Sequence, residues 1–243
     1  MHMDRVYSDI HSFAAENIRK FTSDANVGFE GALCDSTWGG GDMEQLAKIN
    51  QFIAEYPSAS ANELFRAFKA PETRLGMVTG AYPEFMSNLE RSKYTVWQNL
   101  FSGGSLLIYW MANGYDILNG NMVGPALRPD LEPFPWFSTT ADEVKKLRNG
   151  AAILIKNAVP EDFGVAIIYD RLSDFSATAE ERTTMINQFV RLAKDIGHQP
   201  EFLSWNMIMK DKLLLKKYSA IILPSTSCLP HDAVAVLENH MAE

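Results

Sequence analysis

The sequence has few of the residues that mark metal sites, disulfide frameworks or histidine-based catalysis. Only two of its 243 residues are cysteine, and Cys34 and Cys228 lie far apart without metal-ligand spacing, so neither a zinc site nor a disulfide framework is predicted. The five histidines show no shared spacing, which favours neither a metal site nor a catalytic triad. They are His2, His11, His198, His231 and His240.

Long apolar runs and basic clusters are also lacking. The longest apolar stretch, residues 106–112, is far shorter than the roughly 20 residues that span a bilayer. No basic cluster exceeds two residues and the net charge is −8, so we expect neither a membrane nor a nucleic-acid partner. Charged residues interrupt the first twenty positions, so no signal peptide is predicted and the default expectation for location is the cytoplasm.

What the sequence does contain is typical of a globular α/β protein. Apolar residues make up 47% and charged residues 21%. Val6, Ile10 and Phe13 recur at helical spacing in an N-terminal amphipathic helix, and a later helix is predicted to run from Met43 through Ile53. Helical segments alternate with short apolar strands, which favours parallel sheets. The expected strands are residues 26–33, 74–79, 105–111, 164–169, 199–204 and 219–223.

The order of elements predicts two units, residues 1–155 and 160–243. Each looks incomplete, because the first shows only about three strand–helix pairs and the second stops on a helix after its third strand, leaving a sheet edge uncovered.

Five local motifs occur in an order that resembles the β-galactosidase-like glycoside hydrolases of the family 42 type. They are residues 97–104 (WQNLFSGG), 125–130 (PALRPD), 133–137 (PFPWF), 165–170 (VAIIYD) and 218–225 (YSAIILPS). The resemblance extends over residues 20–243. It implies the C-terminal portion of a (β/α)₈ TIM barrel followed by a partial flavodoxin-like trimerisation domain. Residues 26–33, 74–80 and 106–110 would then be barrel strands six, seven and eight, and strands one to five would be missing.

The resemblance also implies a chemistry. Such enzymes hydrolyse glycosidic bonds of carbohydrates with two carboxyl groups and without a metal or organic cofactor, and the parent protein would be a trimer. The acid/base glutamate of the family pattern would lie upstream of Met1. The closest match to the nucleophile is Glu84, just after a predicted strand. The chain alone is therefore expected to be an inactive fragment.

Further candidates come from the residues themselves. Glu30 lies among apolar residues near a strand end, where burial would raise its pKa as suits an acid catalyst, although alternation could instead point it outward toward a helix. Aromatic side chains at strand ends can stack on sugar rings, and Asp35 and Asp42 flank a glycine-rich loop where they could contact sugar hydroxyls. The aromatic residues expected at strand ends are Trp38, Tyr82, Tyr109 and Trp110, and the candidates for substrate binding among them are Trp38, Tyr82 and Trp110.

Two other functions stay open. The chain could be a non-catalytic α/β assembly or carbohydrate-binding module. It could also be a flavodoxin-like flavin or nucleotide binder, but residues 170–174 (DRLSD) bring two acids to the loop that would hold a phosphate, which disfavours that function.

Overall fold

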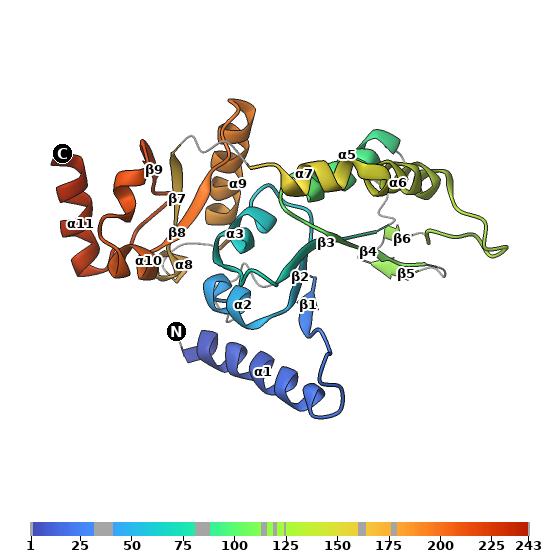
Figure 1. The fold of residues 1–243 in the computed structure, drawn as a ribbon, viewed down its shortest axis with the longest axis horizontal. Coiled ribbons are helices and arrows are strands. Elements are labelled where there is room, and N and C mark those ends of the chain that lie inside the picture. Colours follow the sequence, from blue (N-terminus) through green and yellow to red (C-terminus); the bar gives the residue numbers. More distant parts are fainter. Residues whose placement is uncertain are drawn as a thin grey trace.

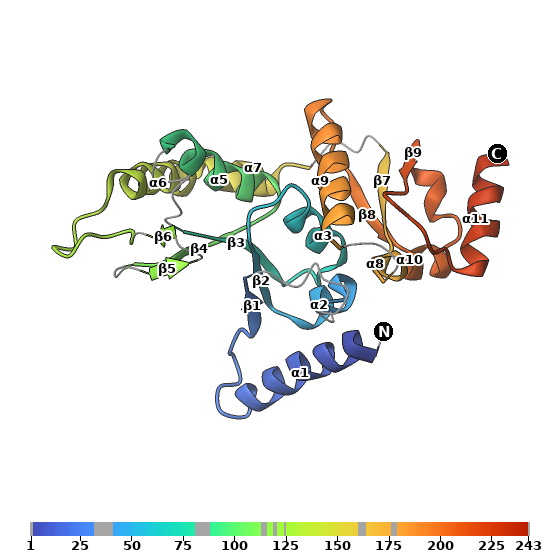
Figure 2. The ribbon, with the colours of Figure 1, turned by 180° about the vertical axis from the view of Figure 1, so that it is seen from behind.

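The chain folds into two parallel sheets, with helices packed between and around them (Figures 1 and 2). The structure is a computed structural model that describes residues 2–31, 41–80, 88–112, 116–118, 121–123, 125–159, 164–175 and 179–242. The first sheet has four strands in the order β1-β2-β3-β4, and every neighbouring pair is parallel. Its strands are β1 (Gly28–Glu30), β2 (Phe52–Glu55), β3 (Arg74–Gly80) and β4 (Leu106–Trp110).

Helices connect these strands one after another. They are α2 (Met43–Ile49), α3 (Ala61–Phe68) and α5 (Leu89–Phe101). Asp42 caps α2, because its carboxylate accepts hydrogen bonds from the backbone N–H groups of Glu44 and Gln45. Leu75 of β3 and Ile53 of β2 pair in register and both pack against α2 and α3, so this face of the sheet is the helix side. Side chains alternate along a strand, so Gly76 and Val78 belong to the other face.

β2 corrects a prediction. Phe52 and Ile53 were expected at the end of the helix that begins at Met43, but that helix ends at Ile49 and Asn50 closes it with extended backbone. The side-chain amide of Asn50 bonds the carbonyl of Leu46, and Thr73 bonds the carbonyl of Asn50, which draws the chain into the sheet. The remaining predicted strands are all present, so the first sheet has one strand more than the sequence indicated.

The second sheet follows the order β8-β7-β9 and is also parallel. Its central strand is buried along its whole length, which explains the continuous apolar run in the sequence. The strands are β7 (Val165–Tyr169), β8 (Glu201–Ser204) and β9 (Ala220–Ile222). The helices around them are α8 (Arg171–Asp174), α9 (Ala179–Asp195), α10 (Trp205–Lys210), the short η2 (Leu214–Lys217) and α11 (His231–Ala242).

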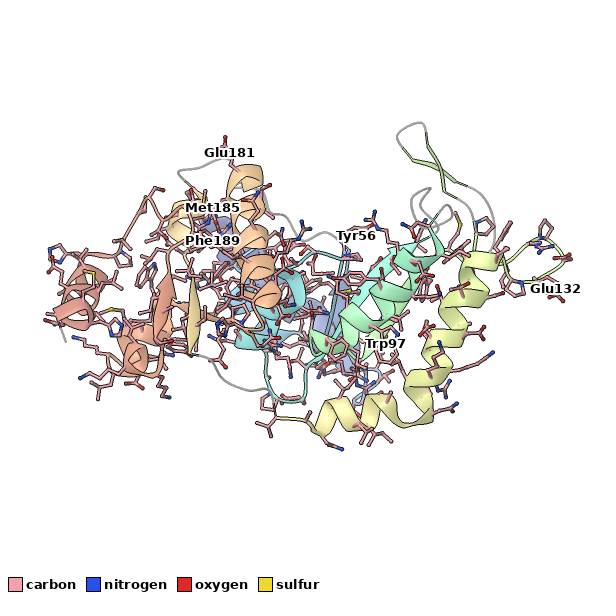
Figure 3. The ribbon with its side chains drawn as sticks, turned by 90° about the horizontal axis from the view of Figure 1, so that it is seen from above. Tyr56, Trp97, Glu132, Glu181, Met185 and Phe189 are labelled. Atoms are coloured by element: carbon pink, nitrogen blue, oxygen red, sulfur yellow. The ribbon has the colours of Figure 1, made fainter. Side chains whose placement is uncertain are left out.

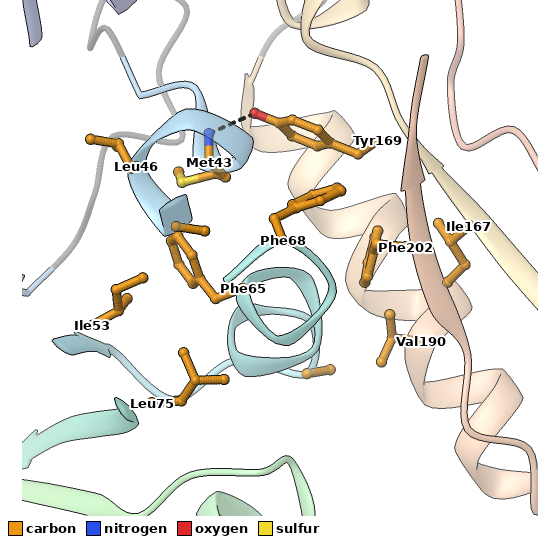
Figure 4. Close-up of a cluster of buried hydrophobic side chains, with 12 residues drawn as sticks. Met43, Leu46, Ile53, Phe65, Phe68, Leu75, Ile167, Tyr169, Val190 and Phe202 are labelled. Carbon is orange, nitrogen blue, oxygen red and sulfur yellow. Dashed lines mark hydrogen bonds between the residues drawn. The ribbon is translucent and has the colours of Figure 1, made fainter. Parts of the chain in front are cut away.

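One apolar core joins the two sheets. Phe65 and Phe68 of α3 pack on Ile53 and Leu75 of the first sheet and on Phe202 of the second (Figure 4). Helix α3 therefore has a sheet on each side. The strands of the first sheet all precede residues 155–160 and those of the second all follow them, but the two sheets share one core, so the division into units 1–155 and 160–243 stays a prediction.

The segment after β4 forms a small hairpin and a bent helical arm. The hairpin pairs β5 (Asp116–Leu118) with β6 (Asn121–Val123), and the arm consists of α6 (Pro135–Lys146), η1 (Leu147–Ala151) and α7 (Ala152–Asn157). Figure 3 shows the arm bending around α5, which carries Trp97. The bend contains Gly150 at φ 126°, a backbone conformation that favours glycine.

The predicted N-terminal helix is present as α1 (His2–Arg19), but its apolar stripe does not face the protein. Ile10 and Phe13 are exposed, whereas Asp4 and Ser8 are buried against the rest of the chain. Polar contacts contribute to holding it, since Ser8 bonds Gln45 and Asp4 pairs with an arginine of the second unit, and Tyr7 packs against the apolar core. Among the residues described, no helix is long and apolar enough to span a bilayer.

Candidate carbohydrate site

The site residues predicted from the sequence that the structure describes lie at the carboxyl ends of strands in the first sheet. Glu30 ends β1 and Trp110 ends β4, and both are described. Four other candidates lie outside the described residues and have no structural account: Glu84, Trp38, Tyr82 and Asp35.

Glu30 ends β1 as an exposed residue. It pairs in register with Ala54 of β2, which pairs with Gly76 of β3, so Glu30 belongs to the face opposite the helices. Glu30 is therefore not the buried carboxylate that the sequence pattern indicated. The alternative orientation, outward toward a helix, is not present either, because the strand position of Glu30 belongs to the face opposite the helices.

Trp110 lies on that same open face and is 49% exposed. It pairs in register with Gly80 of β3, and because glycine has no side chain, no side chain stands beside Trp110 at that position of β3. In register, Trp110 lies four residues beyond the level of Glu30 and three strands away. With a strand spacing of about 4.8 Å and a rise of about 3.3 Å per residue, their Cα atoms would be about 19 Å apart in a flat sheet. The two residues share a face but do not form one binding subsite.

Sequence reasoning missed one carboxylate at these strand ends. Glu55 ends β2 and is buried. It pairs with Met77 on the helix side, so it and Glu30 point to opposite faces of the sheet. Placing the strand from residue 52 would have revealed it, and the signal was the asparagine that follows the short α2 helix.

Two residues considered for sugar contacts or strand-end stacking have structural roles. Both carboxylate oxygens of Asp42 are occupied at the start of α2, one by the N–H of Glu44 (3.0 Å) and the other by the side chain of Gln45 (2.7 Å), while burial raises the pKa of Asp42. Tyr109 points to the helix side of β4, where its ring packs against Trp136 and Phe137. Burial raises the pKa of Tyr109 well above its ordinary value, so it stays a neutral phenol.

A flavin or nucleotide binder would hold its phosphate at the loop that follows β7. Asp170 is fully buried and accepts a hydrogen bond from the N–H of Leu172 and another from the hydroxyl of Ser173. The hydroxyl of Ser173 in turn accepts the backbone N–H groups of Ser227 and Cys228. Amide groups that could cradle an anion are thus already bonded within the protein. Within the described ranges, no cluster of histidine, cysteine, aspartate or glutamate could hold a metal ion.

Comparison with known proteins gives a likeness of fold. No protein-family model and no curated protein sequence matches the chain. Among solved structures, it is similar to the apo exo-carrageenase GH42 of Bacteroides ovatus, with a TM-score of 0.65 and 13% identity over 99% of this chain and 36% of that one. It is also similar to the β-galactosidase of Bacillus circulans sp. alkalophilus, with a TM-score of 0.64 and 15% identity over 90% of this chain and 34% of that one.

A third similar structure is GH5_18 of Streptomyces cattleya in complex with GlcNAc, with a TM-score of 0.54 and 14% identity over 76% of this chain and 52% of that one. The chain thus has a glycoside-hydrolase-like α/β fold. It spans about a third of the length of the exo-carrageenase and of the β-galactosidase.

Proposed function

We propose that this chain is the C-terminal part of a β-galactosidase-like glycoside hydrolase: the second half of a (β/α)₈ barrel followed by the start of a flavodoxin-like oligomerisation domain. The observation that carries this proposal is the order of the two parallel sheets along the chain and the order of the strands within each. Four parallel strands stand in consecutive order with their helices on one face, as in half a barrel, and a parallel sheet with its first strand in the centre follows. The likeness to the exo-carrageenase structure extends over nearly the whole chain.

The additional strand changes the barrel numbering. If β3 and β4 are strands seven and eight, β2 is strand six and β1 is strand five. Glu30 would then end strand five and Glu55 strand six. The open face with Glu30 and Trp110 would be the interior of the barrel, where sugar-binding side chains belong at the carboxyl ends of the strands.

The proposed chemistry divides the catalytic carboxyl groups between this chain and the other half of the barrel. Glu84, in the segment that follows β3, is proposed as the nucleophile, and the acid/base carboxyl would come from the half that this chain does not supply. A retaining glycosidase needs both groups about 5–5.5 Å apart. We therefore expect the chain alone not to hydrolyse an ordinary aryl galactoside.

A fluorinated galactoside with a dinitrophenolate leaving group tests the nucleophile separately. Such a leaving group departs without an acid catalyst, so a nucleophile alone can form the covalent glycosyl intermediate. We expect mass spectrometry to find one added sugar on Glu84, absent from Glu84→Gln and unchanged in Glu90→Gln, a matched carboxylate of the exposed α5 surface that pairs with Lys93 at 2.6 Å. Labelling of Glu30 would reassign the nucleophile. No labelling at saturating reagent would remove the catalytic proposal.

An assembly module is the second candidate, and the exposed stripe of α1 favours it. Ile10, Phe13 and Phe21 are largely exposed on or just after this helix, and exposed apolar surface often marks an interface. Light scattering after gel filtration distinguishes the candidates: a defined oligomer that Phe13→Ser converts to a monomer would support assembly, and a monomer at all concentrations would contradict it.

A further inference from the structure

A cavity of about 550 Å³ lies between α3 and the second sheet. Glu63, Arg66 and Ala67 of α3 form one wall, at the i, i+3 and i+4 spacing that puts side chains on one helix face. The other walls come from β8, α10 and η2. This position is on the helix side of the first sheet, opposite the face that carries Glu30 and Trp110. The volume is in the range of small-molecule sites, which often occur between structural units.

Polar and apolar side chains contribute to the cavity surface in similar measure, and the apolar part comes from several elements. Phe202 of β8 is 1% exposed, and Met207 and Leu214 line the same space from α10 and η2. Ala67 contributes only a methyl group, so the α3 wall stands back from β8. A ligand would place a hydrocarbon or aromatic body here, because water gains little from such a surface.

Two carboxylates, Glu63 and Glu201, and two cations, Arg66 and Lys217, line the cavity, and both carboxylates already have partners. The carboxylate of Glu63 is fully buried and contacts Arg66 at 2.7 Å as well as the ammonium of Lys194. One buried carboxylate therefore faces two cations. At the opposite wall, Glu201 accepts the phenol O–H of Tyr218 at 2.5 Å, while the exposed ammonium of Lys217 has no ion-pair partner within the part of the chain described.

We propose that this cavity binds a small organic carboxylate with an apolar body. The carboxylate head is held by Arg66 and Lys217, and the body lies on the partly exposed side chains of Ala67, Met207 and Leu214. The guanidinium fork of Arg66 uses one nitrogen for Glu63, which orients it and leaves further N–H donors for a planar anion. Because the groups come from both units, the ligand would also strengthen their contact. The proposal does not depend on the glycosidase proposal.

Three probes of one shape test the charge requirement by calorimetric titration of the whole chain. Hydrocinnamate has a carboxylate, hydrocinnamamide is its neutral analogue, and phenethylammonium is a cation. We expect hydrocinnamate to bind and each of the other two probes to bind at least about tenfold more weakly. A tenfold loss is the size of effect that a lost charge-assisted contact gives. Equal binding of the amide, preferred binding of the cation, or no binding of hydrocinnamate would overturn the proposal.

Variants locate the binding. Lys217→Gln changes an exposed side chain and is expected to weaken hydrocinnamate about tenfold, with Lys212→Gln, another exposed lysine, as the unchanged control. Ala67→Leu fills the cavity and should abolish binding, while circular dichroism verifies the fold. Arg66→Gln would leave the buried Glu63 with one cation fewer, so Lys217→Gln is the decisive variant. Unaltered binding in Lys217→Gln and Ala67→Leu would place the ligand elsewhere and refute the site.

Discussion

The hydrogen bond between Tyr169 and the backbone of Met43 gives a sharp measure of how the two units are held together. The N–H of Met43, at the start of α2, donates to the phenol oxygen of Tyr169 at 2.9 Å (Figure 4), and the two residues lie 126 positions apart in the chain. Both are buried in the shared core. Tyr169→Phe removes a single oxygen and leaves the N–H of Met43 without this acceptor.

The expected loss can be worked from that geometry. An N–H deprived of its partner in a buried position costs about 1–3 kcal/mol, because the group cannot return to water while the protein stays folded. For a chain of this length that corresponds to a fall of roughly 3–9 °C in Tm. Urea denaturation followed by circular dichroism measures the free energy of unfolding directly.

The matched control is Tyr56→Phe, which removes the same oxygen from a side chain that is 41% exposed. Its free energy of unfolding should stay within about 0.5 kcal/mol of wild type. If Tyr169→Phe behaved like this control, α2 would not rest on the second sheet as described, and the shared core would be refuted.

Three other perturbations follow from the described contacts. Burial raises the pKa of Tyr169 well above its ordinary value, so above about pH 10 the folded chain keeps a proton that the unfolded chain releases. The difference in free energy of unfolding between wild type and Tyr169→Phe should therefore shrink as the pH rises above about 10, which urea denaturation at each pH measures. Burial opposes ionisation of Asp4, yet Arg171 outweighs it and lowers the pKa of Asp4, so this contact stabilises the fold above about pH 4 and is lost as the pH falls through the lowered value. The protection of the α1 amides against hydrogen exchange, corrected for the intrinsic rate at each pH, should then fall in wild type and hardly change in an already weakened Asp4→Asn. Gly150→Ala should cost about 1–2 kcal/mol in urea denaturation, since no atom crowds the added methyl and only the backbone conformation opposes it; a gain in stability would refute this.

The parts of the fold that sequence patterns predicted are those governed by local signals. A continuous apolar run predicted β7, because a parallel strand buried on both faces must be apolar on both, and short apolar segments next to glycine or proline breaks predicted β3 and β4. β2 escaped because Phe52 and Ile53 continue the helical spacing of α2, and only the capping of that helix by Asn50 separates them. Glu55 was missed for the same reason.

Which face of a helix or strand is buried depends on partners that are distant in sequence. The periodicity of the sequence alone does not identify that face. The stripe of Ile10 and Phe13 predicted a buried face for α1, yet the polar side carries Asp4, whose partner Arg171 is 167 positions away. In α1 the buried face combines this ion pair with Tyr7 and Ala15, so contacts with distant residues rather than the apolar stripe decide the orientation of the helix. For Glu30, alternation left two orientations open, and the pairing with Ala54 in the missed strand was needed to choose between them.

Helix α3 connects these observations. Its residues Phe65 and Phe68 join the two sheets through apolar contact, while Glu63 on another side of the same helix accepts a hydrogen bond from Gln199 (2.8 Å) and contacts Lys194 of the second unit. A buried carboxylate without such partners would be costly, so the charge of Glu63 is tolerable only while the second unit is docked. The apolar contacts supply the attraction and the buried charge supplies the specificity of the docked arrangement. The face of the first sheet that carries Glu30 and Trp110 is opposite to α3 and takes no part in this contact.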